Sequence, residues 1–185
     1  PFPLGEPAGF AERSGIVFVG NFSHQPNADG ILWFIQEILP LIRTEVPEAT
    51  LTVVGANPPP AVAEHESEHV RMAGFVSDEE LLAHYSRSRV IVVPLRYGAG
   101  VKGKLIEACA HGVPAVTTPI GAEGIAQVEE IAAVADSPER FAERLISLYR
   151  DPAGWQSLRD SQIRYAERYL SVDYALSILS QDIGG

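Results

Sequence analysis

Short apolar runs alternate along the chain with longer segments in which apolar residues recur every three or four positions. A short apolar run bounded by turn residues is typical of a buried strand, and the longer spacing is typical of a helix that buries one face. Strands are predicted at residues 15–20, 49–55, 70–76, 89–94, 114–117 and 131–134. Helices are predicted at residues 27–43, 102–110, 138–150 and 152–169. Ser77 with Glu80 three residues later matches a capping box, which predicts that a further helix begins there.

Strands that are apolar on both faces and alternate with helices are typical of a parallel sheet with helices on both faces and right-handed crossovers. The sequence therefore predicts an α/β fold with a Rossmann-like parallel sheet. In such sheets the ligand binds beyond the carboxyl ends of the strands. A functional site is therefore expected in the loops that follow Gly20, Gly55, Pro94 and Thr118.

The same pattern sets the expected limits of the domain. Residues 1–14 are rich in Pro and Gly and follow neither period, so we expect a linker there and one domain over residues 15–185. The chain begins at Pro1 and its single methionine is Met72. We therefore expect that it was cut from a longer protein.

Composition and charge narrow the function classes. Hydrophobic residues make up 46% of the 185 residues, and no apolar run reaches the roughly 20 residues that span a bilayer. Because the first residues also lack a signal-peptide pattern, a cytoplasmic location is expected. The formal net charge of -10 argues against nucleic-acid binding, which requires a basic face. An anionic ligand must therefore be met by a local site.

Cysteine and histidine residues indicate neither redox nor metal chemistry. Cys109 is the single cysteine and lies in an apolar helical pattern, so we expect it to pack in the core. His65 and His69 are four residues apart, but no third ligand is evident and no metal site is predicted. His111 precedes Gly112 at a predicted helix end, where an imidazole suits the helix dipole, so a structural role is expected.

The most informative segment runs from Pro94 to Pro114, where a strand is followed by a glycine-rich loop and a helix. Glycines allow backbone N–H groups to approach a ligand closely, and a helix N-terminus favours phosphate. Lys102 and Lys104 are the only lysines of the chain. Their placement predicts a diphosphate site, with a solvated basic loop as the alternative. Glu107, one turn after Lys104, could accept hydrogen bonds from ribose hydroxyls, or it could simply complement the helix dipole or pair with Lys104.

A dinucleotide site is a competing interpretation of the same loop. Gly98, Gly100 and Gly103 satisfy the G-x-G-x-x-G pattern, and Glu123 lies 20 residues after Gly103. That pattern normally follows the first strand of the fold, however, and here it follows about the fourth. Two lysines also crowd the turn, and residues 117–122 come between the predicted strand and Glu123. A nicotinamide-dependent oxidoreductase is therefore the less favoured alternative.

Several segments resemble, in order, those of the group 1 glycosyltransferases, which are retaining enzymes of the GT-B fold. The main match is Gly98-Ala-Gly-Val-Lys-Gly-Lys-Leu-Ile-Glu-Ala, and others lie at residues 18–22, 26–30, 51–55, 74–76, 111–118 and 121–124. Together they cover roughly Gly15 to Tyr169. The chain thus resembles the C-terminal, donor-binding half of such an enzyme.

The resemblance implies roles for individual residues. The first loop and the glycine-rich loop of the family hold the donor diphosphate, which here implies binding by Gly20, Asn21, Gly98, Ala99, Gly100, Val101, Lys102 and Gly103. Lys104 is expected to stabilise the departing diphosphate during catalysis, with Glu107 at the ribose. Val76 is expected against the base. His24 lies on the first loop, where it either touches phosphate or sugar or is a solvated loop residue.

Two departures from the family pattern concern catalysis. Ala99 stands where the family often has a glutamate near the sugar, and Asn21 and Asp29 stand where the first loop often offers an arginine and a lysine. A non-catalytic nucleotide-sugar-binding or interaction module is therefore an alternative to an enzyme.

The expected function is binding of a nucleotide-diphosphate sugar for glycosyl transfer to an acceptor held by an N-terminal domain of the same parent chain. The isolated chain is expected to bind the donor without turning it over. No cofactor beyond the donor substrate and no metal is expected. Peripheral membrane association is expected only through the part of the parent protein outside this chain.

Overall fold

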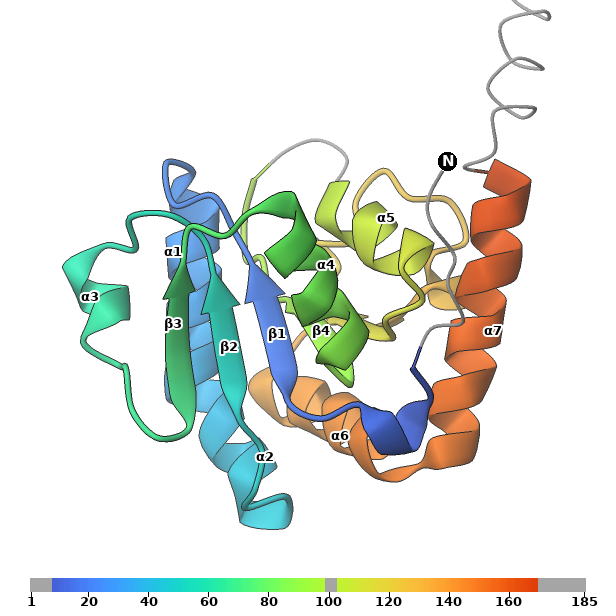
Figure 1. The fold of residues 1–185 in the computed structure, drawn as a ribbon, viewed down its shortest axis with the longest axis horizontal. Helices are drawn as coiled ribbons and strands as arrows, with labels where there is room; N and C mark the ends of the chain where they lie inside the picture. The colour runs from blue at the N-terminus through green and yellow to red at the C-terminus, as the bar shows by residue number, and fades with distance from the viewer. Residues whose placement is uncertain (1–7, 99–102, 170–185) are drawn as a thin grey trace, which may run out of the picture.

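Six parallel strands form one sheet in the computed structural model, which describes residues 8–98 and 103–169 of the chain. Their order across the sheet is β3-β2-β1-β4-β5-β6 (Figure 1). Ile16 of the central strand is paired with Leu51 on one side and Val90 on the other. The strands are β1 (Ile16–Val19), β2 (Leu51–Val54), β3 (Val70–Gly74), β4 (Val90–Val93), β5 (Ala115–Thr117) and β6 (Ala132–Val134).

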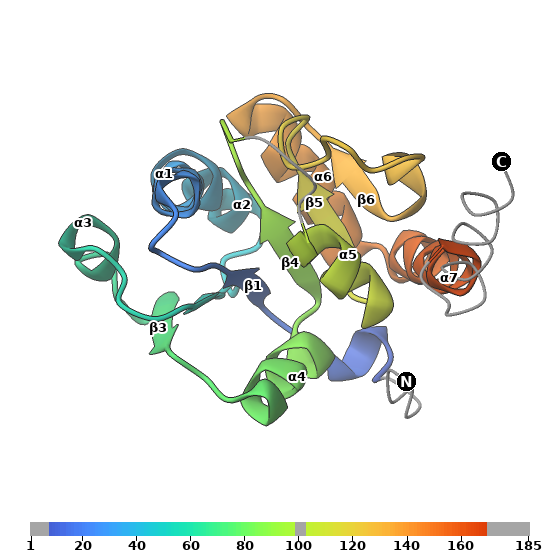
Figure 2. The same ribbon diagram turned by 90° about the horizontal axis from the view of Figure 1, so that it is seen from above.

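Helices cover both faces of the sheet, as Figure 2 shows. One face carries α1 (Gln25–Trp33), the π-helical turn η2 (Phe34–Ile38), α2 (Leu39–Glu45), α3 (Pro60–Ala63) and α6 (Pro138–Arg150). The other carries α4 (Asp78–Arg87), α5 (Gly103–Ala110) and α7 (Pro152–Tyr169). Two short 3-10 turns are η1 (Phe10–Glu12) and η3 (Val128–Glu130). The predicted Rossmann-like α/β fold is confirmed.

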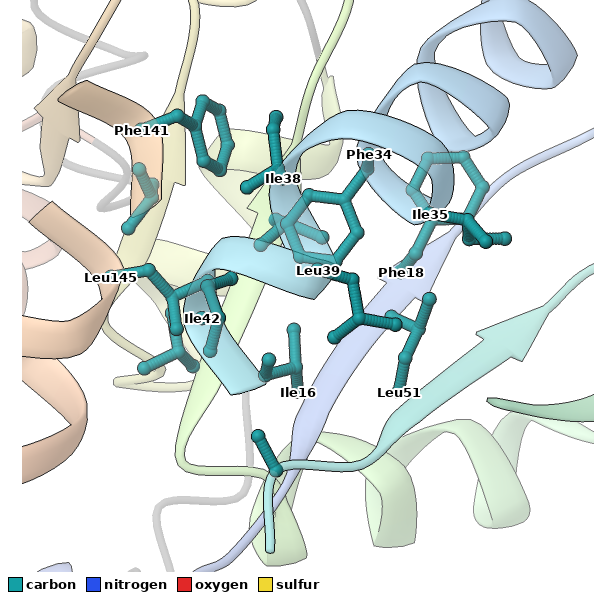
Figure 3. Close-up of a cluster of buried hydrophobic side chains, with 14 of the residues drawn as sticks. Ile16, Phe18, Phe34, Ile35, Ile38, Leu39, Ile42, Leu51, Phe141 and Leu145 are labelled. Atoms are coloured by element: carbon teal, nitrogen blue, oxygen red, sulfur yellow. The ribbon is translucent and has the colours of Figure 1, made fainter. Parts of the chain in front are cut away.

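The two core clusters follow from alternation along the strands. In β1, Ile16 and Phe18 point to the face covered by α1, α2 and α6, whereas Val17 belongs to the cluster on the opposite face. In the first cluster the rings of Phe34 and Phe141 meet edge to face, with their centroids 5.9 Å apart (Figure 3). The central strands β1 and β4 are therefore buried on both sides, which is why their sequences are continuously apolar.

The helix predicted at residues 27–43 is interrupted by the π-helical turn η2. Pro40 lies two residues after that turn, and a proline ring within a helix has no N–H to donate and clashes with the carbonyl four residues before it, here that of Gln36. The wider turn that contains Gln36 gives this carbonyl room. The periodicity alone did not indicate the interruption.

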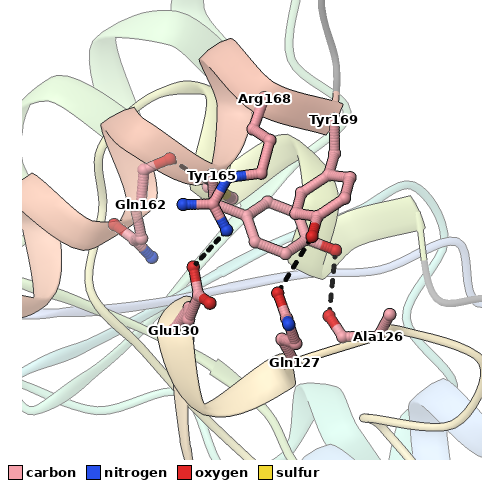
Figure 4. A network of polar contacts seen from close by, with 8 residues as sticks. Ala126, Gln127, Glu130, Gln162, Tyr165, Arg168 and Tyr169 are labelled. Carbon is pink, nitrogen blue, oxygen red and sulfur yellow. Dashed lines mark hydrogen bonds and ion pairs between the residues drawn. The ribbon is translucent and has the colours of Figure 1, made fainter. Parts of the chain in front are cut away.

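Helix α7 is attached to the loops around η3 and β6 by side-chain hydrogen bonds (Figure 4). The Gln162 amide donates to the carbonyl oxygens of Val113 at 2.9 Å and Ile131 at 2.7 Å, and it is fully buried. The Tyr165 hydroxyl donates to the carbonyl oxygen of Ala126 at 3.1 Å. These bonds satisfy buried main-chain acceptors, so α7 is an integral part of the domain.

The segment before β1 packs on the domain, although residues 1–14 were expected to form a linker. Arg13 is 1% exposed, and its guanidinium donates to the carbonyl oxygens of Tyr85 at 3.0 Å and Ser88 at 3.2 Å, at the end of α4. Phe10 meets the buried Trp155 ring edge to face, with centroids 5.8 Å apart. Residues 1–7 lie outside the described part of the chain.

Candidate functional site

The predicted ligand edge of the sheet lies where the strand order reverses. β1 and β4 are neighbours, but β1 leads into α1 on one face and β4 leads toward α5 on the other. In sheets of this strand order, the crevice beyond such a pair of strands is the usual ligand site. Gly20 follows β1 there and residues 94–98 follow β4. Two of the four loops singled out from the sequence, those after Gly20 and Pro94, are therefore brought together.

Backbone segments at this edge approach each other at glycines. A Cβ atom added to Gly55 would lie 2.0 Å from the carbonyl oxygen of Gly20, and one added to Gly30 would lie 2.5 Å from that of Pro94. Both distances are far below van der Waals contact. The loops after β1 and β4 therefore have their positions fixed by main-chain packing.

A chain of hydrogen bonds joins the first loop to α5. The Lys104 ammonium donates to Asn27 Oδ1 at 2.5 Å, and Asn27 Nδ2 donates to the carbonyl oxygen of Asn21 at 2.6 Å. Asn27 is 6% exposed, at the beginning of α1. Burial lowers the pKa of Lys104 to about 8, and the negative charge of Glu107 partly opposes that shift. The lysine is thus a partly buried cation held by a neutral amide.

Glu107 lies one turn farther along α5 and is half-buried. It faces Tyr85 of α4, whose phenol pKa is raised by burial first and by the Glu107 charge second. The Tyr85 ring stacks on His111, with centroids 5.1 Å apart and an angle of 15° between the planes. His111 therefore packs against the ring of Tyr85, in line with the structural role expected for it.

Asp29, one of the departures from the family pattern, is paired with a residue that follows β4. The guanidinium of Arg96 donates to both of its carboxylate oxygens, at 2.8 and 2.5 Å, and lies 5.8 Å from the Trp33 ring centroid. A hollow of about 450 Å³ beside Arg96 is lined mainly by apolar side chains, including Trp33, Leu95 and Ile120. The negative charge of Asp29 is therefore compensated locally.

The other predicted site residues lie at different distances from the hydrogen bonds that link Lys104 to Asn21. Gly98 ends the described part of the loop after β4, and Gly103 begins α5. Ala99, Gly100, Val101 and Lys102 lie outside the described residues. His24 is exposed at the N-cap of α1 without a side-chain capping bond. Val76 is half-buried after β3, two strands away from β1, and the hydrogen bonds that link Lys104 to Asn21 do not reach it.

Asn27 is the residue that our sequence reasoning did not single out. It lies in the segment 26–30 that carried part of the family resemblance, but a buried asparagine that bonds two loops cannot be distinguished by spacing from an ordinary helix-start residue. A polar residue at the start of an otherwise buried helix was the available signal.

Residues 8–98 and 103–169 contain no group of three or more His, Cys, Asp or Glu side chains able to hold a metal ion. Within the same ranges, no helix has both the length and the apolar character required to cross a membrane. Cys109 is buried, as expected, and burial raises the pKa of its thiol to about 12. Glu123 lies in a turn after β5 and not at a strand end.

The sequence matches a family profile and one curated protein. The sequence profile described as "Glycosyl transferases group 1" matches residues 13–151. A 44.6 kDa protein of the cps region of Klebsiella pneumoniae is 27% identical over 151 residues, which cover 77% of this chain and 39% of that protein. The chain therefore spans about two fifths of the length of this curated relative.

Solved structures share the fold at low sequence identity. TarM superposes with a TM-score of 0.72 at 13% identity, over 91% of this chain and 35% of TarM. The C-terminal domain of LpcC from Francisella tularensis, a glycosyl transferase group 1 family protein, gives a TM-score of 0.70 at 16% identity, over 88% of this chain and 90% of that domain. WaaG, a glycosyltransferase involved in lipopolysaccharide biosynthesis, superposes with a TM-score of 0.66 at 20% identity, over 93% of this chain and 47% of WaaG.

Proposed function

The chain belongs to the glycosyl transferases group 1 family, and from that premise we propose that residues 15–185 bind the nucleotide-diphosphate sugar donor of a GT-B glycosyltransferase. An N-terminal domain of the same parent chain would hold the acceptor. In this proposal transfer occurs with retention, in the cytoplasm, when both domains are present. The isolated chain binds the donor without efficient turnover, because half of the cleft is missing.

The observation that carries this proposal is the environment of Lys104. Its ammonium is partly buried at the edge where the strand order reverses, and its hydrogen-bond partner is a neutral amide oxygen. Among the described residues, no carboxylate lies within ion-pair distance of it. Burial of a cation without an ion-pair partner is unfavourable, and an anion that binds there offsets this cost. A diphosphate supplies such a charge.

The surrounding groups fit a nucleoside diphosphate. In this proposal the diphosphate accepts hydrogen bonds from N–H groups at the N-terminus of α5 and in the glycine-rich loop, with Gly20 and Asn21 on its other side, in the loop after β1. Glu107, one turn from Lys104 on α5, would accept hydrogen bonds from the ribose hydroxyls. Val76 is assigned to the base and His24 to the phosphate or sugar. Lys104 would then stabilise the negative charge that develops on the leaving diphosphate.

The direct test is a thermal-shift panel of UDP, GDP, ADP and NAD on the 185-residue chain. A ligand that binds only the native state raises the unfolding temperature in proportion to its occupancy. We expect one of the three nucleoside diphosphates to stabilise the chain and NAD to leave it unchanged. Stabilisation by NAD alone would favour the oxidoreductase, and no shift with any of the four would contradict the proposal.

Binding is expected to depend on pH through Lys104. Its pKa in the free protein is lowered to about 8, mainly by burial, and a bound diphosphate raises it, because a nearby anion favours the charged form. Binding therefore takes up a proton, and affinity is lost as the pH rises through the pKa of the free protein. We expect affinity to fall roughly tenfold between about pH 7 and pH 9.

Calorimetry in two buffers of different ionisation enthalpy measures this proton uptake. Lys104→Arg is the matched control, because a guanidinium remains charged throughout the range. A pH dependence that persists unchanged in Lys104→Arg would assign the titration to another group.

A non-catalytic nucleotide-sugar-binding module is the second candidate, because Ala99 stands where the family often has a glutamate. The two candidates differ in the activity of the full parent protein. Donor hydrolysis or sugar transfer that is lost in a Lys104/Glu107 double variant would support the enzyme. Donor binding without either reaction would support the binding module.

A further inference from the structure

Arg96, which follows β4, is held in place at the ligand edge of the sheet. The main chain before it is fixed against α1, because a Cβ atom added to Gly30 would lie 2.5 Å from the carbonyl oxygen of Pro94. Its guanidinium donates from Nε and Nη2 to the two carboxylate oxygens of Asp29, at 2.8 and 2.5 Å, and lies 5.8 Å from the Trp33 ring centroid. Both ends of the side chain are therefore fixed before any ligand binds.

Part of this guanidinium is still available to a ligand. A guanidinium has five N–H donors, and those that point to Asp29 belong to Nε and Nη2. Among the described residues, Nη1 has no hydrogen-bond partner, and 46% of the side chain is exposed. Nη1 can therefore donate to a ligand while the bonds to Asp29 stay intact.

The polar residues of this edge follow one another in an order that suits an extended nucleotide. Glu107, assigned to the ribose, and Lys104, assigned to the diphosphate, belong to α5 on one face of the sheet. Lys104 donates to Asn27 at the start of α1, on the opposite face, and two residues farther along α1 Asp29 holds Arg96. A ligand that extends from Glu107 past Lys104 therefore has Arg96 at the end away from its ribose.

We propose that Arg96 is a second cation of the donor site: its Nη1 donates to the second phosphate of the nucleoside diphosphate, the one that carries the sugar, and Asp29 orients the guanidinium for this bond. The inference rests on the proposed function. It also accounts for a departure from the family pattern, since Asp29 stands where the first loop often offers a cation. In this chain the cation comes from the loop after β4, and the carboxylate holds it.

Asp29→Asn combined with Arg96→Gln tests this, because the double variant removes both charges and keeps the net charge of the site. The measurement is the calorimetric affinity of the 185-residue chain for UDP, GDP and ADP and for the corresponding monophosphates, by displacement where binding is weak. For the base that binds, we expect affinity for the diphosphate to fall about five- to thirtyfold, the scale of a hydrogen bond between two charged groups. Affinity for its monophosphate should change less than about twofold, because the second phosphate is absent.

Glu45→Gln combined with Arg150→Gln is the matched control. These residues also form an exposed arginine–carboxylate pair, at 3.1 Å, but the pair joins the ends of α2 and α6, far from the ligand edge (Figure 1). Its loss should leave the affinity for all six nucleotides at the wild-type value. Both double variants should unfold within about 3 °C of wild type, because exposed ion pairs contribute little to stability.

The outcomes separate this inference from the proposed function. If Arg96 acted only through local charge, the charge-balanced Asp29→Asn/Arg96→Gln variant would bind the diphosphate as wild type does, and the inference would be overturned. Equal weakening of diphosphate and monophosphate binding would overturn it as well, since the bond would then not be to the second phosphate. Either result leaves the site at Lys104 intact. Failure of wild type to bind any of the three diphosphates overturns both the inference and the proposed function.

Discussion

Lys104→Ala is expected to weaken nucleoside-diphosphate binding by about 1–3 kcal/mol, or roughly 5- to 150-fold in Kd. The ammonium is the partly buried cation at the carboxyl edge of β1 and β4, and it has a neutral hydrogen-bond partner. Removing it deletes a charge-assisted bond to phosphate in a site that shields charges poorly. The fold should survive, because the wild-type lysine bears a desolvation cost that alanine does not.

Isothermal calorimetry gives the affinity, and Arg144→Ala is the control for net charge. Arg144 is exposed on α6, away from the loops after β1 and β4, so its loss changes the overall charge by the same amount without touching the site. Equal weakening by the two variants would mean that long-range charge is responsible. An unchanged affinity in Lys104→Ala would refute its role at the diphosphate.

Gly30→Ala is expected to lower the free energy of unfolding by about 1–3 kcal/mol, although alanine is the better helix former by about 1 kcal/mol. The added Cβ would lie 2.5 Å from the carbonyl oxygen of Pro94 and 3.1 Å from its carbonyl carbon, and both belong to the main chain. Neither atom can turn aside as a side chain does. Helix α1 must therefore move away from the loop after β4, which it now contacts directly.

Gly154→Ala is the matched control, since Gly154 is also a helical glycine with a close neighbour. There the added Cβ would lie 2.6 Å from Asp151 Oδ2, an oxygen at the tip of an exposed side chain that can shift, whereas the other oxygen, Oδ1, accepts from the Ala153 N–H. We expect Gly154→Ala to be neutral or to stabilise by up to about 1 kcal/mol in urea unfolding. If Gly30→Ala were as stable as Gly154→Ala, the close approach of α1 to Pro94 would not exist in solution.

Much of the fold could be predicted because its signals are local. Helix α6 begins and ends where the periodicity indicated, and α7 begins at Pro152 as indicated. Ser137 is the N-cap of α6, and Asp151 is its C-cap, directly before α7. The Ser77 capping box is present, with Ser77 Oγ accepting from the Glu80 N–H at 3.3 Å and a Glu80 carboxylate oxygen accepting from the Ser77 N–H at 2.8 Å. The parallel sheet followed from strands without a polar face.

The features that were missed depend on contacts between distant segments or on steric detail. Asn27 bonds Lys104, which lies 77 residues away in the sequence, as well as the nearby Asn21, and a single buried amide produces no periodic pattern. The π-helical turn before Pro40 and the short helix α3 within the proline-rich loop arise from local geometry that apolar spacing does not record. The docking of Arg13 against α4 was hidden because its flanks are rich in Pro and Gly.

The contacts of Arg13 also determine where this domain can be joined to another protein in a chimaera. Its guanidinium holds the end of α4, and Phe10 covers the Trp155 ring, so the folded module begins before the first strand of its sheet. A chimaera joined at Gly15 would lack Phe10 and Arg13, and with them the contacts to Trp155 and to the end of α4. A junction placed before residue 8 carries them along, and exchange of donor domains between relatives should therefore use that boundary.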